Sequence, residues 1–201
     1  MHRLFASAIA LTALTALITQ FFVSTETMGS PGLATVLWRM LGFFTVLTNI
    51  LVVFTFARTA ISGQRNGPVW IGGLTLWICA VGAVYHAVLA TLWNPEGLAW
   101  WADQGLHTAV PILVLIWWLG FADKTGLRPY SALMWLVWPL VYCAYALTRG
   151  TVSGFYPYPF IDVATLGTGQ VALNIAMLII AFGLGGLGLV AIARLLSNRS
   201  V

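Results

Sequence analysis

Six long apolar stretches divide this chain, and each is longer and poorer in charge than the core elements of soluble proteins. They fall at about residues 4–23, 34–57, 69–93, 102–121, 130–147 and 170–196. Because a helix rises about 1.5 Å per residue, about 20 apolar residues cross the hydrocarbon core of a bilayer. The sequence therefore predicts an all-α fold, a polytopic membrane protein with six transmembrane helices that form a single domain over residues 1–201.

The amino-acid composition favours the same class. Of the 201 residues, 60% are hydrophobic and only 7% are charged, whereas soluble domains carry about 25% charged residues. The two cysteines, Cys79 and Cys143, fall inside apolar stretches, where we assign them no chemistry. No metal and no cofactor are expected. The formal net charge is +4, but basic residues in a membrane protein first of all indicate its orientation in the membrane. No nucleic-acid partner is therefore expected either.

The positions of the basic residues predict the orientation in the membrane. With six helices, one side receives most of them, namely Arg3, Arg58, Arg65, Lys124, Arg128, Arg194 and Arg199. The other side receives only Arg39 and Arg149. Since cytoplasmic loops carry the excess of Lys and Arg, both termini are predicted to lie in the cytoplasm.

The fourth stretch contains an acid and a base inside apolar sequence, in the segment Trp101-Ala-Asp-Gln-Gly-Leu-His-Thr108. An ionisable side chain in hydrocarbon costs about 2.5–3.5 kcal/mol on insertion scales, so it usually marks a site. Asp103 and His107 are one helical turn apart, where the carboxylate could hold one imidazole nitrogen. The alternative is that both side chains only satisfy the outer end of a membrane helix. Pro111 predicts a kink just after the histidine.

Other polar side chains fall on the neighbouring stretches. Thr45, Thr48 and Asn49 share one helix face, which by itself favours hydrogen bonding between helices. The third stretch contains Tyr85 and His86, the second also contains Arg39, and the sixth contains Asn174. Counted from the outer helix ends, these groups occupy the outer half of the membrane, with Thr45 several ångströms deeper than His107. This layering predicts a shared polar cavity that opens outward.

A long aromatic connection is expected between the fifth and sixth helices, from residue 149 to about residue 168. Its aromatic side chains argue against disorder. They are interpreted either as anchors at the membrane interface or as a lid over an outward-facing pocket.

Three of these segments resemble one family of membrane proteins. Phe43-Phe-Thr-Val-Leu-Thr-Asn49, Asp103-Gln-Gly-Leu-His-Thr108 and Tyr156-Pro-Tyr-Pro-Phe-Ile-Asp162 are similar to the bacterial Pr6Pr branch of the androgen-induced-gene family. The resemblance implies six helices with both termini inside, here in a bacterial inner membrane. It also implies an intramembrane threonine hydrolase, because vertebrate relatives cleave fatty acid esters of hydroxy fatty acids.

Carried over by motif, the base is His107 and the nucleophile is Thr45, with Thr48 as the alternative because Asn49 lies one residue further on than the family spacing. The residues themselves are chemically compatible with this assignment. A neutral His107 held by Asp103 could take the proton of a threonine hydroxyl. The first candidate for stabilising the oxyanion is Asn49, followed by His86, Tyr85, Arg39 and Asn174. The expected partners are a lipid ester substrate and membrane lipids.

Two other classes of function remain open from the sequence. A haem protein would use His86 and His107 as axial ligands on adjacent helices, although membrane cytochromes usually supply more than one such pair. A transporter or a structural membrane protein would use the cavity without chemistry. The scarcity of charged groups in the inner half of the helices argues against an ion path.

Overall fold

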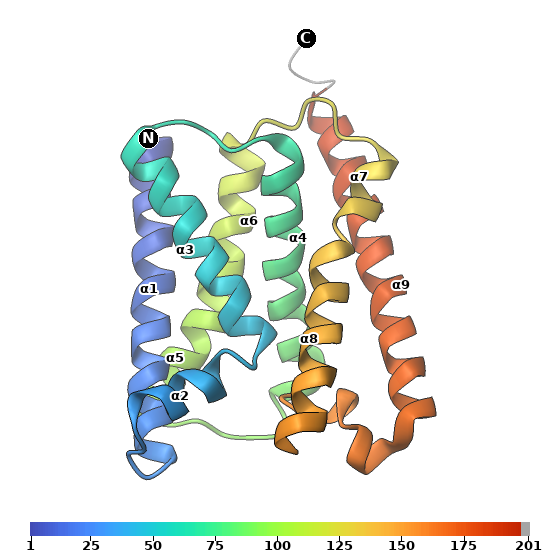
Figure 1. Ribbon diagram of the computed structural model, residues 1–201. Coiled ribbons are helices and arrows are strands. Elements are labelled where there is room, and N and C mark those ends of the chain that lie inside the picture. The colour runs from blue at the N-terminus through green and yellow to red at the C-terminus, as the bar shows by residue number, and fades with distance from the viewer. Residues whose placement is uncertain (198–201) are drawn as a thin grey trace. The chain divides into compact units, whose positions relative to one another are not determined.

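The computed structural model describes residues 1–197, which fold into helices with no β-strand among them (Figure 1). Six helices are long and apolar enough to cross a membrane: His2–Thr27, Phe44–Ser62, Pro68–Leu89, Gly97–Phe121, Pro129–Ser153 and Val163–Ser197. This confirms the predicted all-α fold with six membrane helices. Arg199, one of the residues used to predict orientation, lies outside the described residues.

The chain groups into two compact units, Met1–Asp123 and Lys124–Val201. The single domain expected over residues 1–201 stays a prediction. The first unit contains α1 (His2–Thr27), α2 (Leu33–Met40), α3 (Phe44–Ser62), α4 (Pro68–Val84), the π-helix η1 (Tyr85–Leu89), α5 (Gly97–Gln104), the π-helix η2 (Gly105–Ala109) and α6 (Val110–Phe121). It also contains every polar residue of the candidate site except Asn174.

In the first unit, hydrogen bonds from Arg3 link the start of α1 to the end of α3. The guanidinium of Arg3 donates hydrogen bonds to the carbonyls of Ala60 and Ile61, at 3.0 and 2.9 Å. These carbonyls belong to the last turn of α3, where helix geometry leaves the acceptors without a partner inside the helix. Gly63 then ends α3 in the left-handed conformation, with φ of 73°. Arg3 thereby fixes two antiparallel helices at one end of the unit.

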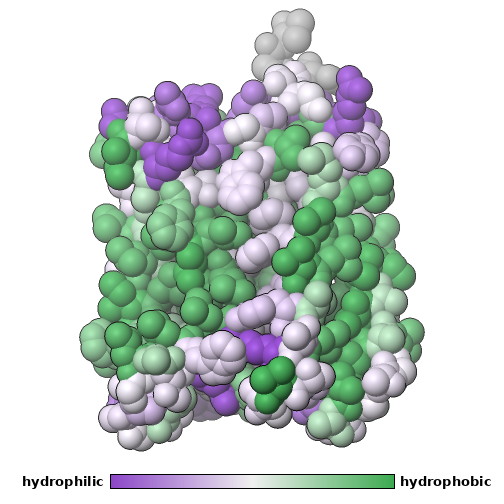
Figure 2. Space-filling model, in the orientation of Figure 1, coloured by the Kyte–Doolittle hydropathy of each residue, from purple (hydrophilic) through white to green (hydrophobic). Residues whose placement is uncertain are grey.

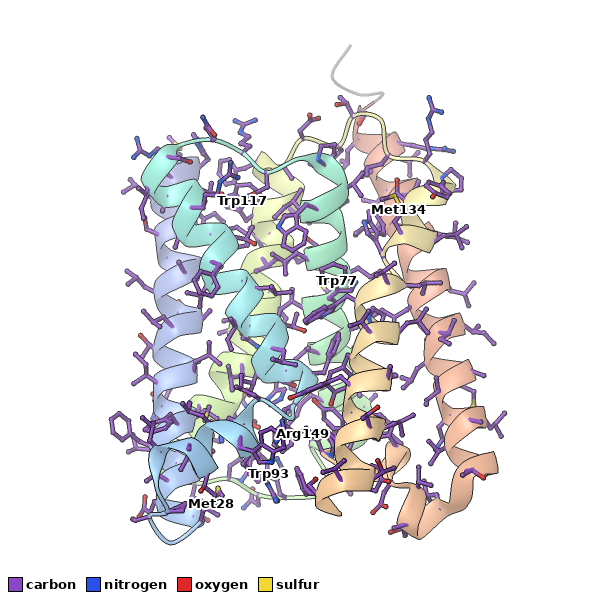
Figure 3. All side chains as sticks on the ribbon, in the orientation of Figure 1. Met28, Trp77, Trp93, Trp117, Met134 and Arg149 are labelled. Atoms are coloured by element: carbon purple, nitrogen blue, oxygen red, sulfur yellow. The ribbon has the colours of Figure 1, made fainter. Side chains whose placement is uncertain are left out.

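The two ends of the first unit differ in polarity. Trp117 lies toward the end that carries the N-terminus, where its indole N–H donates to the carbonyl of His2, and Met28 and Trp93 lie toward the other end (Figure 3). On the face that Figure 2 shows, apolar side chains cover the middle of this unit and hydrophilic side chains gather at the N-terminal end. A middle covered with apolar side chains is what a membrane-spanning bundle requires.

The second predicted span, residues 34–57, is wrong as a single helix. The helix breaks at residues 41–43, where Phe43 is extended with φ of −91° and ψ of 133°, so α2 and α3 are separate. Glycine is unfavourable inside a helix, and Gly42 lies in the break. The corner also buries apolar side chains, with Phe43 packed against a cluster that contains Val36, Met40 and Val46. Thr45 therefore lies in the first turn of α3, not in the middle of a long helix.

The second unit contains α7 (Pro129–Met134), α8 (Val137–Ser153), the 3-10 helix η3 (Pro159–Ile161) and α9 (Val163–Ser197). A break at residues 135–136 separates α7 from α8, and Pro139 lies in the first turn of α8. Helix α9 packs closely on α7 at Gly186. A methyl group added to this glycine would lie only 3.0 Å from the Cβ atom of Ala132.

The start predicted for the long connection, residues 149–168, is wrong. Helix α8 continues to Ser153, and Gly154 ends it in the left-handed conformation with φ of 68°. The carboxylate of Asp162 then accepts the backbone N–H groups of Ala164 and Thr165, at 2.9 and 3.2 Å, and this caps the start of α9. The irregular connection is residues 154–162, and residues 163–166 then form a short helical segment. Gly167, with φ of 77° and ψ of 160°, interrupts α9, so the long part of this helix begins after it, close to the predicted end of the connection.

The aromatic side chains of this connection pack within their own unit. The ring of Tyr156 covers Gly150, where a methyl group would come within 2.1 Å of it. Tyr158 is buried and stacks on Phe160 with ring centroids 5.2 Å apart. These contacts order the segment against α8.

Candidate functional site

Two segments of the first unit, α3 and η2, bring the predicted threonine and histidine together. Thr45 lies in the first turn of α3, and its Oγ1 is 3.4 Å from Nε2 of His107 in η2. Both Thr45 and Thr48 are buried, but the hydroxyl placed on this imidazole nitrogen is that of Thr45. The break between α2 and α3 explains the pairing, because it brings Thr45 to a helix end and closes the depth gap expected from the sequence.

The other imidazole nitrogen faces two acceptors on Asp103. Nδ1 of His107 lies 3.1 Å from the backbone carbonyl oxygen of Asp103 and 3.2 Å from its carboxylate Oδ1. Only the carbonyl contact meets the geometry of a hydrogen bond, while the buried Oδ1 lies within ion-pair distance and has no hydrogen-bond partner. Because a carbonyl and a carboxylate both accept, the proton of a neutral imidazole belongs on Nδ1. Nε2 then carries the lone pair and accepts the hydroxyl of Thr45, which is the arrangement of a general base.

The second carboxylate oxygen of Asp103 has partners of its own. Oδ2 accepts a short hydrogen bond from the phenol of Tyr85 and a longer one, 3.3 Å, from the amide of Gln104. The whole of Asp103 is only 1% exposed, and a buried carboxylate requires such donors. The ring of Tyr85 also stacks on the imidazole of His107, with centroids 4.1 Å apart and planes 15° apart. Tyr85 therefore contacts both members of the Asp103 and His107 pair.

Both helices that carry this network change to π-helix at the site. Backbone hydrogen bonds from Ala90 to Tyr85 and from Val110 to Gly105 span five residues in place of four. Single π-turns inside α-helices are frequently found at functional sites. Close packing surrounds the second one, since a methyl group on Gly82 of α4 would lie 2.9 Å from the carbonyl oxygen of His107.

The side chain of Asn49 donates hydrogen bonds to the backbone of the site. Its Nδ2 donates to the carbonyl of Thr45 at 2.9 Å and, at a longer 3.5 Å, to the carbonyl of Leu106. In a π-helix the Leu106 carbonyl would accept from residue 111, but Pro111 has no N–H to donate. Both N–H groups of the Asn49 amide therefore face backbone carbonyls, and in this geometry neither points to a substrate oxyanion.

A second pair of threonine and histidine lies beside the first and has the opposite hydrogen-bond direction. Nε2 of His86 is 3.0 Å from Oγ1 of Thr108, and that hydroxyl donates to Oε1 of Gln104 at 2.9 Å. Since the hydroxyl proton is already used, His86 must be the donor to Thr108. His86 is also exposed. The direction of the bonds thus separates His107, an acceptor of a hydroxyl proton, from His86.

The remaining oxyanion candidates are Tyr85, Arg39 and Asn174. The phenol of Tyr85 is committed to Asp103, and Arg39 is an exposed residue of α2, before the break. Asn174 lies in the second unit, where it donates to the carbonyl of Phe160 at 2.8 Å and accepts from Gln170 at 2.9 Å.

Sequence reasoning identified Thr45, Asp103, His107 and Tyr85, but it missed Gln104 and Thr108. Both are polar residues directly next to Asp103 and His107 in an apolar stretch, and this adjacency was the available signal. Within residues 1–197, no group of three His, Cys, Asp or Glu side chains could hold a metal ion.

Comparison of the chain with models of protein families, with curated proteins and with solved structures finds no match. The resemblance carried by the three motifs stays a prediction, and functional assignment depends on the geometry of the site.

Proposed function

We propose that this protein is an intramembrane lipid esterase in which Thr45 is the nucleophile, His107 the general base and Asp103 the group that orients the base. The observation that carries the proposal is the order of contacts from the Thr45 hydroxyl to Nε2 of His107, and from Nδ1 to Asp103. The distance of 3.4 Å is slightly longer than the 2.6–3.2 Å of an active nucleophile and base, as is common without substrate.

The reaction would follow in two balanced halves. Nε2 of His107 takes the proton of the Thr45 hydroxyl while Oγ1 attacks the ester carbonyl carbon. The C–O bond to the alcohol then breaks, and the alcohol leaves with the proton from Nε2. In the second half, Nε2 of His107 takes a proton from water while the water oxygen attacks the acyl carbon. The bond from that carbon to Oγ1 then breaks, Nε2 returns the proton to Oγ1 of Thr45, and the carboxylic acid is released.

The oxyanion formed at the carbonyl needs positive potential close to Thr45. Helix α3 is 19 residues long and Thr45 is its second residue. The dipole of a helix is equivalent to about +0.5 charge at this end. The dipole of α3 therefore places positive potential where the negative charge develops, a role for which side chains were predicted from the sequence.

A lipid ester is the substrate class that fits a site on membrane helices, because long acyl chains partition into the bilayer. The resemblance of the three motifs supports a fatty acid ester, such as an ester of a hydroxy fatty acid. The basic residues support an orientation with both termini in the cytoplasm, and the resemblance of the three motifs supports a bacterial inner membrane. A transporter or structural protein remains the alternative, because polar groups between helices also occur without chemistry.

Covalent labelling tests the proposal. A fluorophosphonate probe should label purified wild-type protein, and the same protein should hydrolyse a long-chain ester. Thr45→Ala should abolish both signals and Thr45→Ser should keep part of the labelling, since serine retains the hydroxyl. Thr48→Ala is the matched control.

The possible results distinguish the esterase proposal from its alternatives. Labelling that disappears only in Thr48→Ala makes Thr48 the nucleophile, and labelling that survives the double variant eliminates a threonine hydrolase. A Soret band that is lost in both His86→Ala and His107→Ala would instead support the haem protein.

A further inference from the structure

We infer that Tyr85 is a positioning residue that sets the orientation and tautomer of His107 by holding Asp103, an inference that rests on the proposed function for its catalytic meaning. Tyr85 would not touch the reacting atoms. Its role follows from two contacts, one through the hydroxyl and one through the ring.

The hydroxyl contact divides the carboxylate of Asp103 into two differently occupied oxygens. Oδ2 accepts from Tyr85 and from Gln104, which leaves Oδ1 facing Nδ1 of His107. Without Tyr85, only the 3.3 Å contact from Gln104 would hold the carboxylate, and that amide also serves Thr108. The carboxylate would then turn, and the imidazole would keep mainly the neutral carbonyl of Asp103 as its acceptor.

The burial of both partners makes this contact strong. Tyr85 is 5% exposed and Asp103 is 1% exposed. A phenol removed from water needs an acceptor, and a hydrogen bond to an ionised acceptor is roughly twice as strong as a neutral one. The contact therefore fixes the carboxylate more firmly than the same pair at a surface would.

The ring contact limits the orientation of the imidazole. The stacked rings, 4.1 Å apart, allow His107 to turn only within a plane nearly parallel to the phenol ring. In that plane the nitrogens point to Asp103 on one side and to Thr45 on the other. Phenylalanine would keep the stacking and lose the hydroxyl, so Tyr85→Phe separates the two contributions.

Nitrogen-15 NMR of the histidine side chains in detergent micelles tests the inference without reference to activity. The chain contains three histidines, and a His107→Asn spectrum assigns the signals of His107. Wild-type protein should show a protonated Nδ1 and an unprotonated Nε2. In Tyr85→Phe the two shifts should move toward each other, as in a mixture of tautomers. Tyr130→Phe, at an exposed tyrosine of the second unit, should leave them unchanged.

A kinetic measurement adds the catalytic consequence. Tyr85→Phe should lower kcat about tenfold with KM changed less than about twofold, and tenfold corresponds to about 1.4 kcal/mol. Asp103→Leu removes the group through which Tyr85 acts, so it should produce the same spectral change if Tyr85→Phe does not fold.

Unchanged His107 shifts in folded Tyr85→Phe, or in Asp103→Leu, would overturn the inference. If the tautomer changes as expected but wild-type protein hydrolyses no ester, the positioning role is supported and the esterase proposal fails. The two ideas are therefore tested separately.

Discussion

Gly105 lies against Ala16 so closely that a methyl group on Gly105 would come within 2.7 Å of the Cβ atom of Ala16. Gly105 begins the π-helix that carries His107. Gly105→Ala should therefore push this segment away from α1, with a loss of about 1–3 kcal/mol in the free energy of unfolding. Ester hydrolysis should fall with it, because His107 moves relative to Thr45. Denaturation in detergent and a hydrolysis assay measure the two effects.

The same contact provides its own control. Ala16→Gly removes the opposing methyl group, so the double variant Ala16→Gly with Gly105→Ala should recover most of the stability and activity. Gly183→Ala serves as a matched substitution, since nothing lies within 4 Å of a methyl group there. Failure of the double variant to recover would mean that Gly105 is needed for the π-turn itself and not for the packing.

The two histidines should differ sharply in their effect on activity. His107→Ala should abolish ester hydrolysis, because it removes the acceptor of the Thr45 hydroxyl proton. His86→Ala should only reduce it, since His86 reaches Asp103 indirectly through Thr108 and Gln104. Hydrolysis rates of the two purified variants, compared at equal folded fraction, check this difference. Equal loss in both would contradict the hydrogen-bond directions described for the two pairs.

Substitution of Asn49 should lower the stability of the protein more than it changes the chemical step. Asn49→Ala leaves the carbonyl of Leu106 opposite Pro111 without its donor, and an unsatisfied buried acceptor costs about 1–3 kcal/mol. Asn49→Asp should cost more, because it places carboxylate oxygens against two carbonyls. Thermal unfolding in detergent measures both. A variant with wild-type stability and a large loss in kcat would favour the oxyanion role predicted from the sequence.

The pairing of Asp103 with His107 could be predicted because it is local. Two residues four apart on a helix share a face whatever else the chain does. The six membrane helices could also be predicted from the sequence, since the length of each hydrophobic stretch does not depend on the rest of the chain. The contact between Thr45 and His107 was expected from the motifs, yet the sequence could not explain how two helices of different apparent depth bring these residues together.

What the sequence missed depends on packing between helices. The break before α3 lies in the apolar residues 41–43, which continue a hydrophobic stretch and show no change in pattern except Gly42. The π-turns likewise have no sequence signal of their own. The second of them depends on contacts of Gly82 and Gly105 with residues distant in the chain. Tyr85 and Asn49 were predicted as oxyanion donors for the same reason. Their hydrogen-bond partners, Asp103 and two backbone carbonyls, are brought to them only by the packing of the helices.

The distribution of charge within the first unit predicts which loops face the cytoplasm. Arg3 is bonded to the end of α3, and Arg58 of the same helix end donates to Asn66 and Gln64 in the loop that follows. This basic end should be cytoplasmic by the positive-inside rule. The loop before α5 carries Glu96 and lies one membrane helix away, so it should face outward.

Cysteine accessibility in intact cells tests this orientation. In a background with Cys79 and Cys143 replaced by alanine, a membrane-impermeant maleimide should label Glu96→Cys and Ala164→Cys from outside. Gln64→Cys should react only after the membrane is opened, and all three positions are exposed in the structure. Labelling of Gln64→Cys in sealed cells would invert the first unit. Opposite sidedness of the residue 96 and residue 164 labels would instead mean that one helix between them does not cross, because α5 to α8 provide two membrane passages.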